Sequence, residues 1–244
     1  MEGPVSGMQT HASPESMRST RGGFSHTSEL AVRIPAQSVV LDADLVPPSS
    51  GHGCVIFAHG SGSGRKSPRN RQVAATLQEA GLGTLLLDLL DAREARRDEL
   101  TAEYRFNIPL LTERLLSATD WILRRPETKG LRLGYFGAST GGAVAMRAAA
   151  LRSEAVGAIV LRGARTDLGD VAAGGLRCPT LILVGGNDPE IERLNRVTLD
   201  KLRCEKRLTV IPRASHLFEE PGALEAVARE TVGWFLRYLV PLTT

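Results

Sequence analysis

Three side chains in the second half of the chain have the types and the order that nucleophilic catalysis requires. Ser139 lies in a Gly-x-Ser-x-Gly pattern, and Asp188 and His216 each follow a later apolar segment. A serine hydroxyl is a poor nucleophile at neutral pH, so it needs a histidine that takes its proton and a carboxylate that orients the histidine. These residues predict covalent catalysis in which Ser139 attacks, His216 is base and then acid, and Asp188 orients the imidazole.

The stretch 131–150 must position the serine, and its pattern predicts a buried strand, a sharp turn and an alanine-rich helix. Gly137 and Gly141 let the two backbones pass close together, while Ser139 takes a strained conformation between them. Such a turn lifts the hydroxyl clear of the sheet and leaves the next amide, that of Thr140, at a helix N-terminus. The alternative is a glycine-rich turn with an incidental serine, and the flanking strand and helix favour the catalytic interpretation.

Strand and helix patterns alternate along the chain, which predicts an α/β fold with a mostly parallel sheet and helices on both faces. Apolar runs predict buried strands at 54–58, 83–88, 156–161, 180–184 and 208–211. Helical spacing predicts helices at 70–80, 108–123, 190–202 and 222–239. Open α/β sheets bind ligands at the carboxyl ends of their strands, which is where Asp188 and His216 fall.

The predicted organisation is one domain over 28–244, preceded by a disordered tail over 1–27. Residues 29–45 alternate polar and apolar side chains, as expected for an antiparallel hairpin at a sheet edge. The strongly charged segment 91–104 predicts a loop or short helix at the rim of the site. Only 49 positions separate Ser139 from Asp188, which leaves no room for a large cap domain.

Composition narrows the classes of partner. The 244 residues carry a formal charge of +3 with acidic and basic residues mixed, which argues against a nucleic-acid surface. No apolar run is long enough to span a membrane. Three cysteines lie in or beside apolar segments without metal-ligand spacing, which indicates core residues in a reducing compartment. We therefore expect a cytoplasmic protein without a metal site, either a monomer or a homodimer.

A glycine-rich loop follows the strand at 54–58 and reads His-Gly-Ser-Gly-Ser-Gly over 59–64. Its glycines would let backbone amides approach a bound oxygen closely. Neither a P-loop nor a dinucleotide-binding pattern is complete there. His59 is an alternative base, but it precedes the serine and adjoins the glycines, so we interpret it as structural.

Each proposed catalytic residue also has a simpler interpretation. Asp188 precedes a proline and could only cap the helix that begins near 190. His216 could be an ordinary loop histidine. Asp167, Glu219 and Glu220 are alternative acids. The joint order of the three residues, each at a strand end, favours the catalytic interpretation.

From about residue 28 onward the chain resembles the α/β-hydrolases, and more narrowly the small, cap-less dienelactone hydrolase-like group. The resemblance rests on segments 59–61, 137–141, 186–188 and 215–218. It implies an oxyanion hole made by the amides of Thr140 and Ser61, with Gly60 as the alternative to Ser61, and no cofactor. Dienelactone hydrolase itself is known for a cysteine nucleophile, whereas position 139 holds serine, and this difference favours ordinary ester hydrolysis.

The absence of room for a lid predicts an open site that hydrolyses small or short-chain carboxylic esters, as a carboxylesterase does. Arg162 and Arg69 follow strand ends near the same rim, which motivates a hypothesis that the substrate is anionic. Structural ion pairs are the alternative for these arginines. A thioesterase, an acyltransferase or a lactone hydrolase would use the same residues, and a non-catalytic binding module is the alternative from a different class.

Overall fold

The computed structural model of the protein describes residues 1, 3, 28–49 and 51–240, and at 170–172 it describes the backbone alone. The strands are β1 (Leu30–Ala36), β2 (Val39–Val46), β3 (Cys54–Ala58), β4 (Gly83–Leu87), β5 (Leu133–Ala138), β6 (Val156–Arg162), β7 (Thr180–Gly185) and β8 (Lys206–Ile211). The α-helices are α1 (Pro68–Glu79), α2 (Ala92–Thr101), α3 (Ile108–Leu123), α4 (Thr140–Leu151), α5 (Pro189–Lys201) and α6 (Ala223–Leu239). Two 3₁₀ segments are η1 (Pro126–Thr128) and η2 (Thr166–Gly175). The predicted tail over 1–27 lies almost wholly outside the described residues.

The described strands form one sheet in the order β1-β2-β4-β3-β5-β6-β7-β8. β2 is antiparallel to both β1 and β4, whereas every pairing from β4 through β8 is parallel. This arrangement confirms the predicted mostly parallel sheet with a hairpin at one edge. The central strands β3, β5, β6 and β7 are buried at every position, because helices cover both faces.

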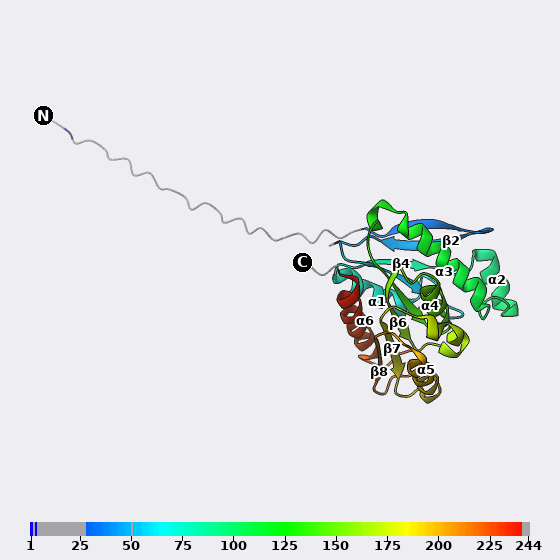
Figure 1. Ribbon diagram of the computed structural model, residues 1–244. Helices are drawn as coiled ribbons and strands as arrows, with labels where there is room; N and C mark the ends of the chain where they lie inside the picture. Colours follow the sequence, from blue (N-terminus) through cyan, green and yellow to red (C-terminus); the bar gives the residue numbers. More distant parts are fainter. Residues whose placement is uncertain (2, 4–27, 50, 241–244) are drawn as a thin grey trace.

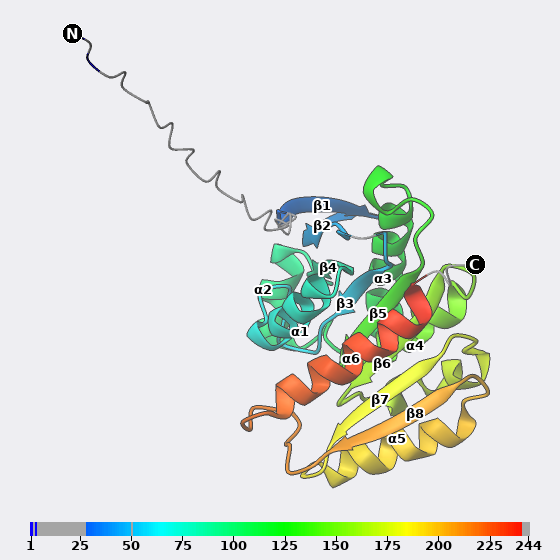
Figure 2. The ribbon, with the colours of Figure 1, turned by 90° about the vertical axis from the view of Figure 1, so that its left-hand side faces the viewer.

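Helices lie on both sides of the sheet (Figure 1). On one face, α1 and α6 pack with aromatic side chains of the sheet and of the loop before α6, including Phe57, Phe136 and Phe218. Figure 2 shows α6 crossing β5 and β6 on this face. On the other face, α3, α4 and α5 cover a larger core that includes Tyr135 and Ile159. Two apolar layers therefore hold the sheet rigid beneath the loops at its carboxyl edge.

The parallel register brings the candidate residues to one edge. Ala58 pairs with Gly137 and Ala138 pairs with Arg162, so the ends of β3, β5 and β6 are level. Gly185 at the end of β7 likewise pairs with Ile211 at the end of β8. The loops that follow these strands carry the glycine loop, Ser139, Asp188 and His216, and so they meet above one edge of the sheet.

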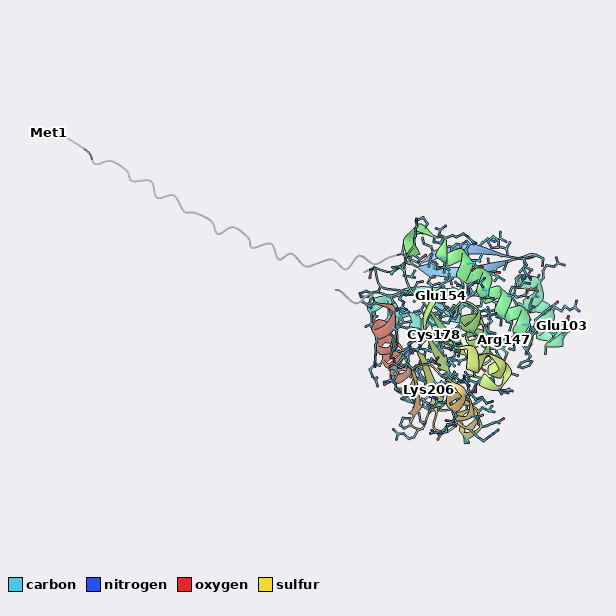
Figure 3. All side chains as sticks on the ribbon, in the orientation of Figure 1. Met1, Glu103, Arg147, Glu154, Cys178 and Lys206 are labelled. Carbon is cyan, nitrogen blue, oxygen red and sulfur yellow. The ribbon has the colours of Figure 1, made fainter. Side chains whose placement is uncertain are left out.

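The charged segment after β4 forms α2, a ten-residue helix of which only Asp98 is buried. Asp91 and Glu94 form a capping box at its start, where Asp91 accepts the Glu94 amide and Glu94 accepts the Asp91 amide. Glu103, just past its end, lies at the outer margin of the molecule (Figure 3). No large cap domain interrupts the described sheet, as predicted. None of the described helices is long and apolar enough to cross a membrane.

Candidate active site

Ser139 occupies a strained turn between β5 and α4. Its φ of 50° and ψ of −121° are conformations that non-glycine residues rarely adopt. The turn is possible because Gly137 and Gly141 have no side chains that would keep β5 and α4 apart. A Cβ on Gly137 would lie 2.7 Å from the carbonyl oxygen of Gly141, and one on Gly141 would lie 2.1 Å from that of Ala58. The predicted close passage of the two backbones is therefore present.

The loop after β6 holds the strained serine from both sides. The Ser139 amide donates to the carbonyl of Arg162 at 3.1 Å, and the Arg165 amide donates to the carbonyl of Ser139 at 3.0 Å. Gly163 of the same loop lies beside His216, since a Cβ there would be 3.5 Å from the imidazole Cε1. One short segment thus supports the backbone of the serine and the face of the histidine ring.

The structure brings Ser139, His216 and Asp188 together in one chain of hydrogen bonds. The Nε2 atom of His216 lies 3.3 Å from Ser139 Oγ, and its Nδ1 atom lies 2.7 Å from Asp188 Oδ2. The histidine side chain is 37% exposed and the aspartate side chain 15%. Asp188 stands at the N-cap of α5 but makes no capping hydrogen bond with its side chain. Its carboxylate is therefore directed to the histidine rather than to the helix.

The loops that carry Asp188 and His216 fit against each other closely. The Asn187 amide donates to Ala214 at 2.9 Å, and the Asn187 side chain donates to the carbonyl of Arg213 at 2.8 Å. A Cβ on Gly185 would lie 2.3 Å from the carbonyl oxygen of Ala214. These contacts fix the acid and the histidine relative to each other before any ligand binds.

His59 has a structural position, in agreement with its interpretation from sequence. Its Nε2 accepts the Leu89 amide at 3.0 Å, so Nδ1 carries the hydrogen and donates to the Gly60 carbonyl at 2.8 Å. Desolvation by the surrounding protein holds the pKa of His59 below its ordinary value, because it disfavours the charged imidazolium, although Gly60 and Asp88 partly oppose this shift. The neutral ring ties the glycine loop to the end of β4.

Ion pairs anchor the far end of the glycine loop. Arg65 donates from its amide and its guanidinium to Asp88, both at 2.7 Å. Asp44, with its side chain 3% exposed, accepts Lys66 at 2.7 Å and Arg71 at 3.1 Å. Burial opposes ionisation of Asp44, but Lys66 and Arg65 hold its pKa below the ordinary range. The loop is therefore held at both ends, by His59 at its start and by Arg65 just past its end.

The predicted oxyanion donors lie beside the nucleophile. Thr140 is the first residue of α4, so its amide has no acceptor within the helix. Gly60 lies so close to Ser139 that an added Cβ would be 3.0 Å from the serine Cβ. The Ser61 amide, however, already donates to Thr140 Oγ1 at 2.8 Å. The sequence placed this amide at the site but did not indicate its side-chain partner.

A cavity of about 380 Å³ opens between the glycine loop and α2. Thr140 lines one side, Ala92 and Ala95 of α2 line another, and Leu90 and Leu111 contribute apolar surface. Its charged residues are Asp42, Asp88, Asp98, Glu99, Arg65 and Arg105. Both arginines are already paired, Arg65 with Asp88 and Arg105 with Asp98. The cavity is therefore acidic in its net charge.

Arg162 and Arg69 lie on the other side of the sheet edge from this cavity. Arg69 pairs with Glu219 at 2.6 Å. Arg162 is 8% exposed, with its guanidinium 5.8 Å from the Phe136 ring and 5.9 Å from the Phe218 ring. Burial and the charge of Arg69 lower the pKa of Arg162 to about 10, so it stays protonated at neutral pH. Of the alternative acids, Asp167 pairs with Arg165, as Glu219 does with Arg69.

Comparison with known proteins decides the family. The model of the dienelactone hydrolase family matches residues 46–234, which include the glycine loop and the Ser139, Asp188 and His216 turns. The chain belongs to the dienelactone hydrolase family. This family membership confirms the resemblance inferred from the motifs.

Solved structures agree with this family assignment. A dienelactone hydrolase from Anabaena variabilis is 52% identical, with a TM-score of 0.86 over 88% of this chain and 100% of that one. Est1E from Butyrivibrio proteoclasticus is 16% identical, with a TM-score of 0.71 over 85% of this chain and 98% of the other, which shows a shared fold. The dienelactone hydrolase family member described here thus has the α/β-hydrolase fold.

Curated relatives from two strains of Mycobacterium tuberculosis carry the name "Putative phosphoribosyl transferase". Each is 44% identical over 208 residues, which is 85% of this chain and 46% of the relative. The chain therefore spans about half the length of the curated relatives that it matches.

Proposed function

We propose that this family member is a serine hydrolase that cleaves small carboxylic esters through an acyl-enzyme. The observation that carries the proposal is the hydrogen-bonded chain from Ser139 Oγ through His216 to Asp188, with 3.3 Å and 2.7 Å separations. A hydroxyl next to an imidazole that a carboxylate orients is the arrangement that activates serine. The 3.3 Å separation is ordinary for a site without substrate, because such bonds tighten in the reacting complex.

The steps follow from the positions of these atoms. Ser139 Oγ attacks the ester carbonyl carbon while its proton passes to His216 Nε2. His216 then gives that proton to the leaving alcohol, and the acyl group stays on Ser139 as an ester. Water attacks this acyl-enzyme, with His216 again acting as base, and the acid product leaves. Asp188 accepts the hydrogen of Nδ1 throughout and stabilises the imidazolium.

The carbonyl oxygen becomes negative when Ser139 attacks, and backbone donors would stabilise it. The Thr140 amide at the start of α4 is the first donor, aided by the partial positive charge of the helix N-terminus. The second donor comes from the glycine loop, where Ser61 lies beside Thr140 and Gly60 is the alternative. No metal or organic cofactor is required for these steps.

The acidic cavity beside Thr140 supports a small, uncharged group in the substrate. Its volume of about 380 Å³ is near the lower end of ordinary ligand pockets. Apolar side chains at Leu90, Ala95 and Leu111 suit a short aliphatic chain, whereas the excess of carboxylates over arginines in the lining disfavours an anion there. Short-chain esters therefore fit this cavity better than long-chain lipids.

Arg162 and Arg69 stay candidate contacts for an anionic group at the opposite end of the site. Burial of Arg162 and the Arg69–Glu219 pair restrict their access, and both features also fit a structural role. Arg162→Ala and Arg69→Ala should raise KM for an ester that carries a carboxylate more than for its neutral analogue. Equal effects on both esters would leave the two arginines with a structural role.

Other acyl-transfer reactions use the same residues. A thioesterase, an acyltransferase or a lactone hydrolase would differ only in the leaving group or the acceptor, and parallel assays on esters, acyl-thioesters and lactones separate them. We do not propose phosphoribosyl transfer, because that name belongs to relatives about twice the matched length and the site here is organised for acyl transfer. In a non-catalytic binding module, the hydrogen-bonded chain of Ser139, His216 and Asp188 would have no chemical role.

The test is hydrolysis of p-nitrophenyl esters from acetate upward by the full chain and by Ser139→Ala. We expect turnover that falls as the acyl chain lengthens and that disappears in the variant. Equal circular dichroism spectra of the two proteins control for folding. Turnover that persists in Ser139→Ala, or no turnover of any ester, thioester or lactone, would overturn the proposed function.

A further inference from the structure

The hydroxyl of Thr140 has a position that the mechanism above does not use. Thr140 is 2% exposed and lines the cavity beside Ser139. Its Oγ1 accepts the Ser61 amide at 2.8 Å, so the hydrogen of that amide is already committed. Among the residues that the structure describes, no hydrogen bond takes the hydrogen of this hydroxyl. The threonine hydroxyl is therefore a buried group at the mouth of the glycine loop that can still donate a hydrogen bond.

We propose that the Thr140 hydroxyl, held and polarised by the Ser61 amide, donates a hydrogen bond to the oxyanion from the side of the glycine loop. The inference rests on the proposed function and assigns one catalytic residue within it. The relay runs from the Ser61 N–H to Thr140 Oγ1, and from the Thr140 O–H to the former carbonyl oxygen. The Thr140 amide, from the same residue, supplies the other hydrogen bond.

Geometry places both members of this relay next to the reacting atom. Thr140 directly follows Ser139, and Gly60 packs against the serine Cβ immediately before Ser61. Glycine at position 60 favours this approach, because an added Cβ would lie 3.0 Å from the Ser139 Cβ and 3.2 Å from the carbonyl oxygen of Ala138, which is tighter than ordinary contact. The Ser61 amide therefore reaches Thr140 beside the close contact between Gly60 and Ser139.

Electrostatics favours a hydroxyl that already accepts a hydrogen bond. Accepting from Ser61 polarises the Thr140 O–H bond, and successive hydrogen bonds of this kind strengthen one another in a low-dielectric site. Fixing Oγ1 also removes most of the rotational freedom that the hydroxyl would otherwise lose when the oxyanion forms. Hydroxyl side chains serve as oxyanion donors in the same way as amides do.

Two rival arrangements make different predictions. If the Thr140 hydroxyl only occupies the place of the oxyanion, removing it frees the Ser61 amide and activity is kept or rises. If the Ser61 side chain is the donor instead, activity depends on that hydroxyl, which is exposed in the structure. Neither rival predicts a specific need for a hydroxyl at position 140.

Kinetics of three variants separate these arrangements. Thr140→Val keeps the shape of the side chain and removes the hydroxyl, Thr140→Ser keeps the hydroxyl, and Ser61→Ala keeps the backbone amide. We expect Thr140→Val to lower kcat about 10²-fold with little change in KM, as loss of one oxyanion donor does. Thr140→Ser, which restores the hydroxyl, should recover most of the loss in kcat, and Ser61→Ala should lower kcat far less than Thr140→Val does.

A transition-state analogue gives a second readout that does not depend on turnover. The affinity of a trifluoromethyl ketone, whose adduct with Ser139 carries the same oxyanion, should fall in Thr140→Val by the factor lost in kcat/KM. Full kcat in Thr140→Val, or loss of activity in Ser61→Ala instead, would overturn the inference. If Ser139→Ala matches the wild type, the proposed function itself fails; if Ser139→Ala is inactive and Thr140→Val is fully active, only this inference fails.

Discussion

The candidate site has two walls that differ in how tightly they are packed. One wall, called here the rigid wall, is formed by the loops that carry Ser139, Asp188 and His216 and by the glycine loop; the other, the adjustable wall, is formed by helix α2 across the cavity. At the serine turn, Gly137 and Gly141 leave no room even for a methyl group, and strand, helix and loop backbones touch one another. The wall made by α2 has one buried residue, and a part-buried ion pair between Glu94 and Arg114 ties it to α3. Leu100 is 89% exposed at its end.

This difference separates chemistry from substrate choice. The atoms of the proposed catalytic chain lie on the tightly packed wall. Positioning for catalysis requires such packing, because these atoms must meet within tenths of an ångström. The α2 wall, which the proposed substrate would contact, is polar and has one buried residue, and such segments tend to come from the less stable part of a fold. Changes on the first wall should affect every substrate alike, whereas changes on the second should depend on the substrate.

The largest effect is expected for Asp188→Asn on the rigid wall. The amide would favour the wrong imidazole tautomer, so kcat should fall about 10⁴-fold for all esters while the fold is kept. Asp167→Asn is the matched control, because Asp167 is also near the site but pairs with Arg165. Steady-state kinetics on two esters of different length checks this, and a loss below tenfold would remove Asp188 from the catalytic chain.

Gly141→Ala should break the same wall through its packing. The added Cβ would lie 2.1 Å from the Ala58 carbonyl oxygen and 2.5 Å from that of His59, so β3 and α4 must separate. We expect about 3 kcal/mol of lost stability. Gly233→Ala is the control, since a Cβ there meets nothing within 4 Å and alanine suits helix α6. Urea unfolding measures both, and equal stability of the two variants would contradict tight packing at the turn.

On the adjustable wall, Ala95→Phe should change substrate choice and little else. The ring would fill part of the cavity between α2 and Thr140, so kcat/KM for a hexanoate ester should fall about tenfold relative to acetate. Ala102→Gly, just beyond the end of α2 at a φ of 55°, controls for changes in the helix that leave the cavity alone. An equal loss on both esters would mean that the cavity does not receive the acyl chain.

The smallest expected effect is a pH dependence of folding stability that arises from His59 in the glycine loop of the rigid wall. Burial holds the pKa of His59 below its ordinary 6.5, so the unfolded chain binds a proton near that pH while the folded chain does not. Stability should therefore be full above about pH 6.5 and fall as the pH drops, by at most about 1.4 kcal/mol per pH unit from this group. Urea unfolding at pH 7.5 and 5.5 should show a smaller difference for His59→Asn, and an unchanged difference would contradict a desolvated, neutral His59 ring.

The sequence predicted the rigid wall well, because its physics is local. A Gly-x-Ser-x-Gly turn between an apolar run and an alanine-rich segment has few ways to fold, and the strand ends that carry Asp188 and His216 follow from the parallel order of the sheet. Strand and helix bounds in the structure agree with the predicted ranges to within a few residues.

The adjustable wall was harder to predict, because its burial is low and its contacts are distant in sequence. The charge of segment 91–104 predicts either a loop or a short helix, although Asp91 and Glu94 have the capping-box spacing that indicates a helix start. The 3₁₀ segment η2 was not predicted. The Arg69–Glu219 pair joins residues 150 positions apart, and the Ser61–Thr140 bond depends on one side-chain rotamer. Sequence periodicity carries no signal for either contact.

The most direct test of the account is covalent labelling with a fluorophosphonate followed by peptide mass spectrometry. An activated serine reacts with this reagent, whereas a serine in an ordinary turn does not. We predict one adduct, on the peptide that contains Ser139, with no labelling of Ser139→Ala and greatly slowed labelling of His216→Ala. A folded wild-type protein that stays unlabelled, or one that carries its adduct on another serine such as Ser61, would contradict the assignment of Ser139 as the nucleophile.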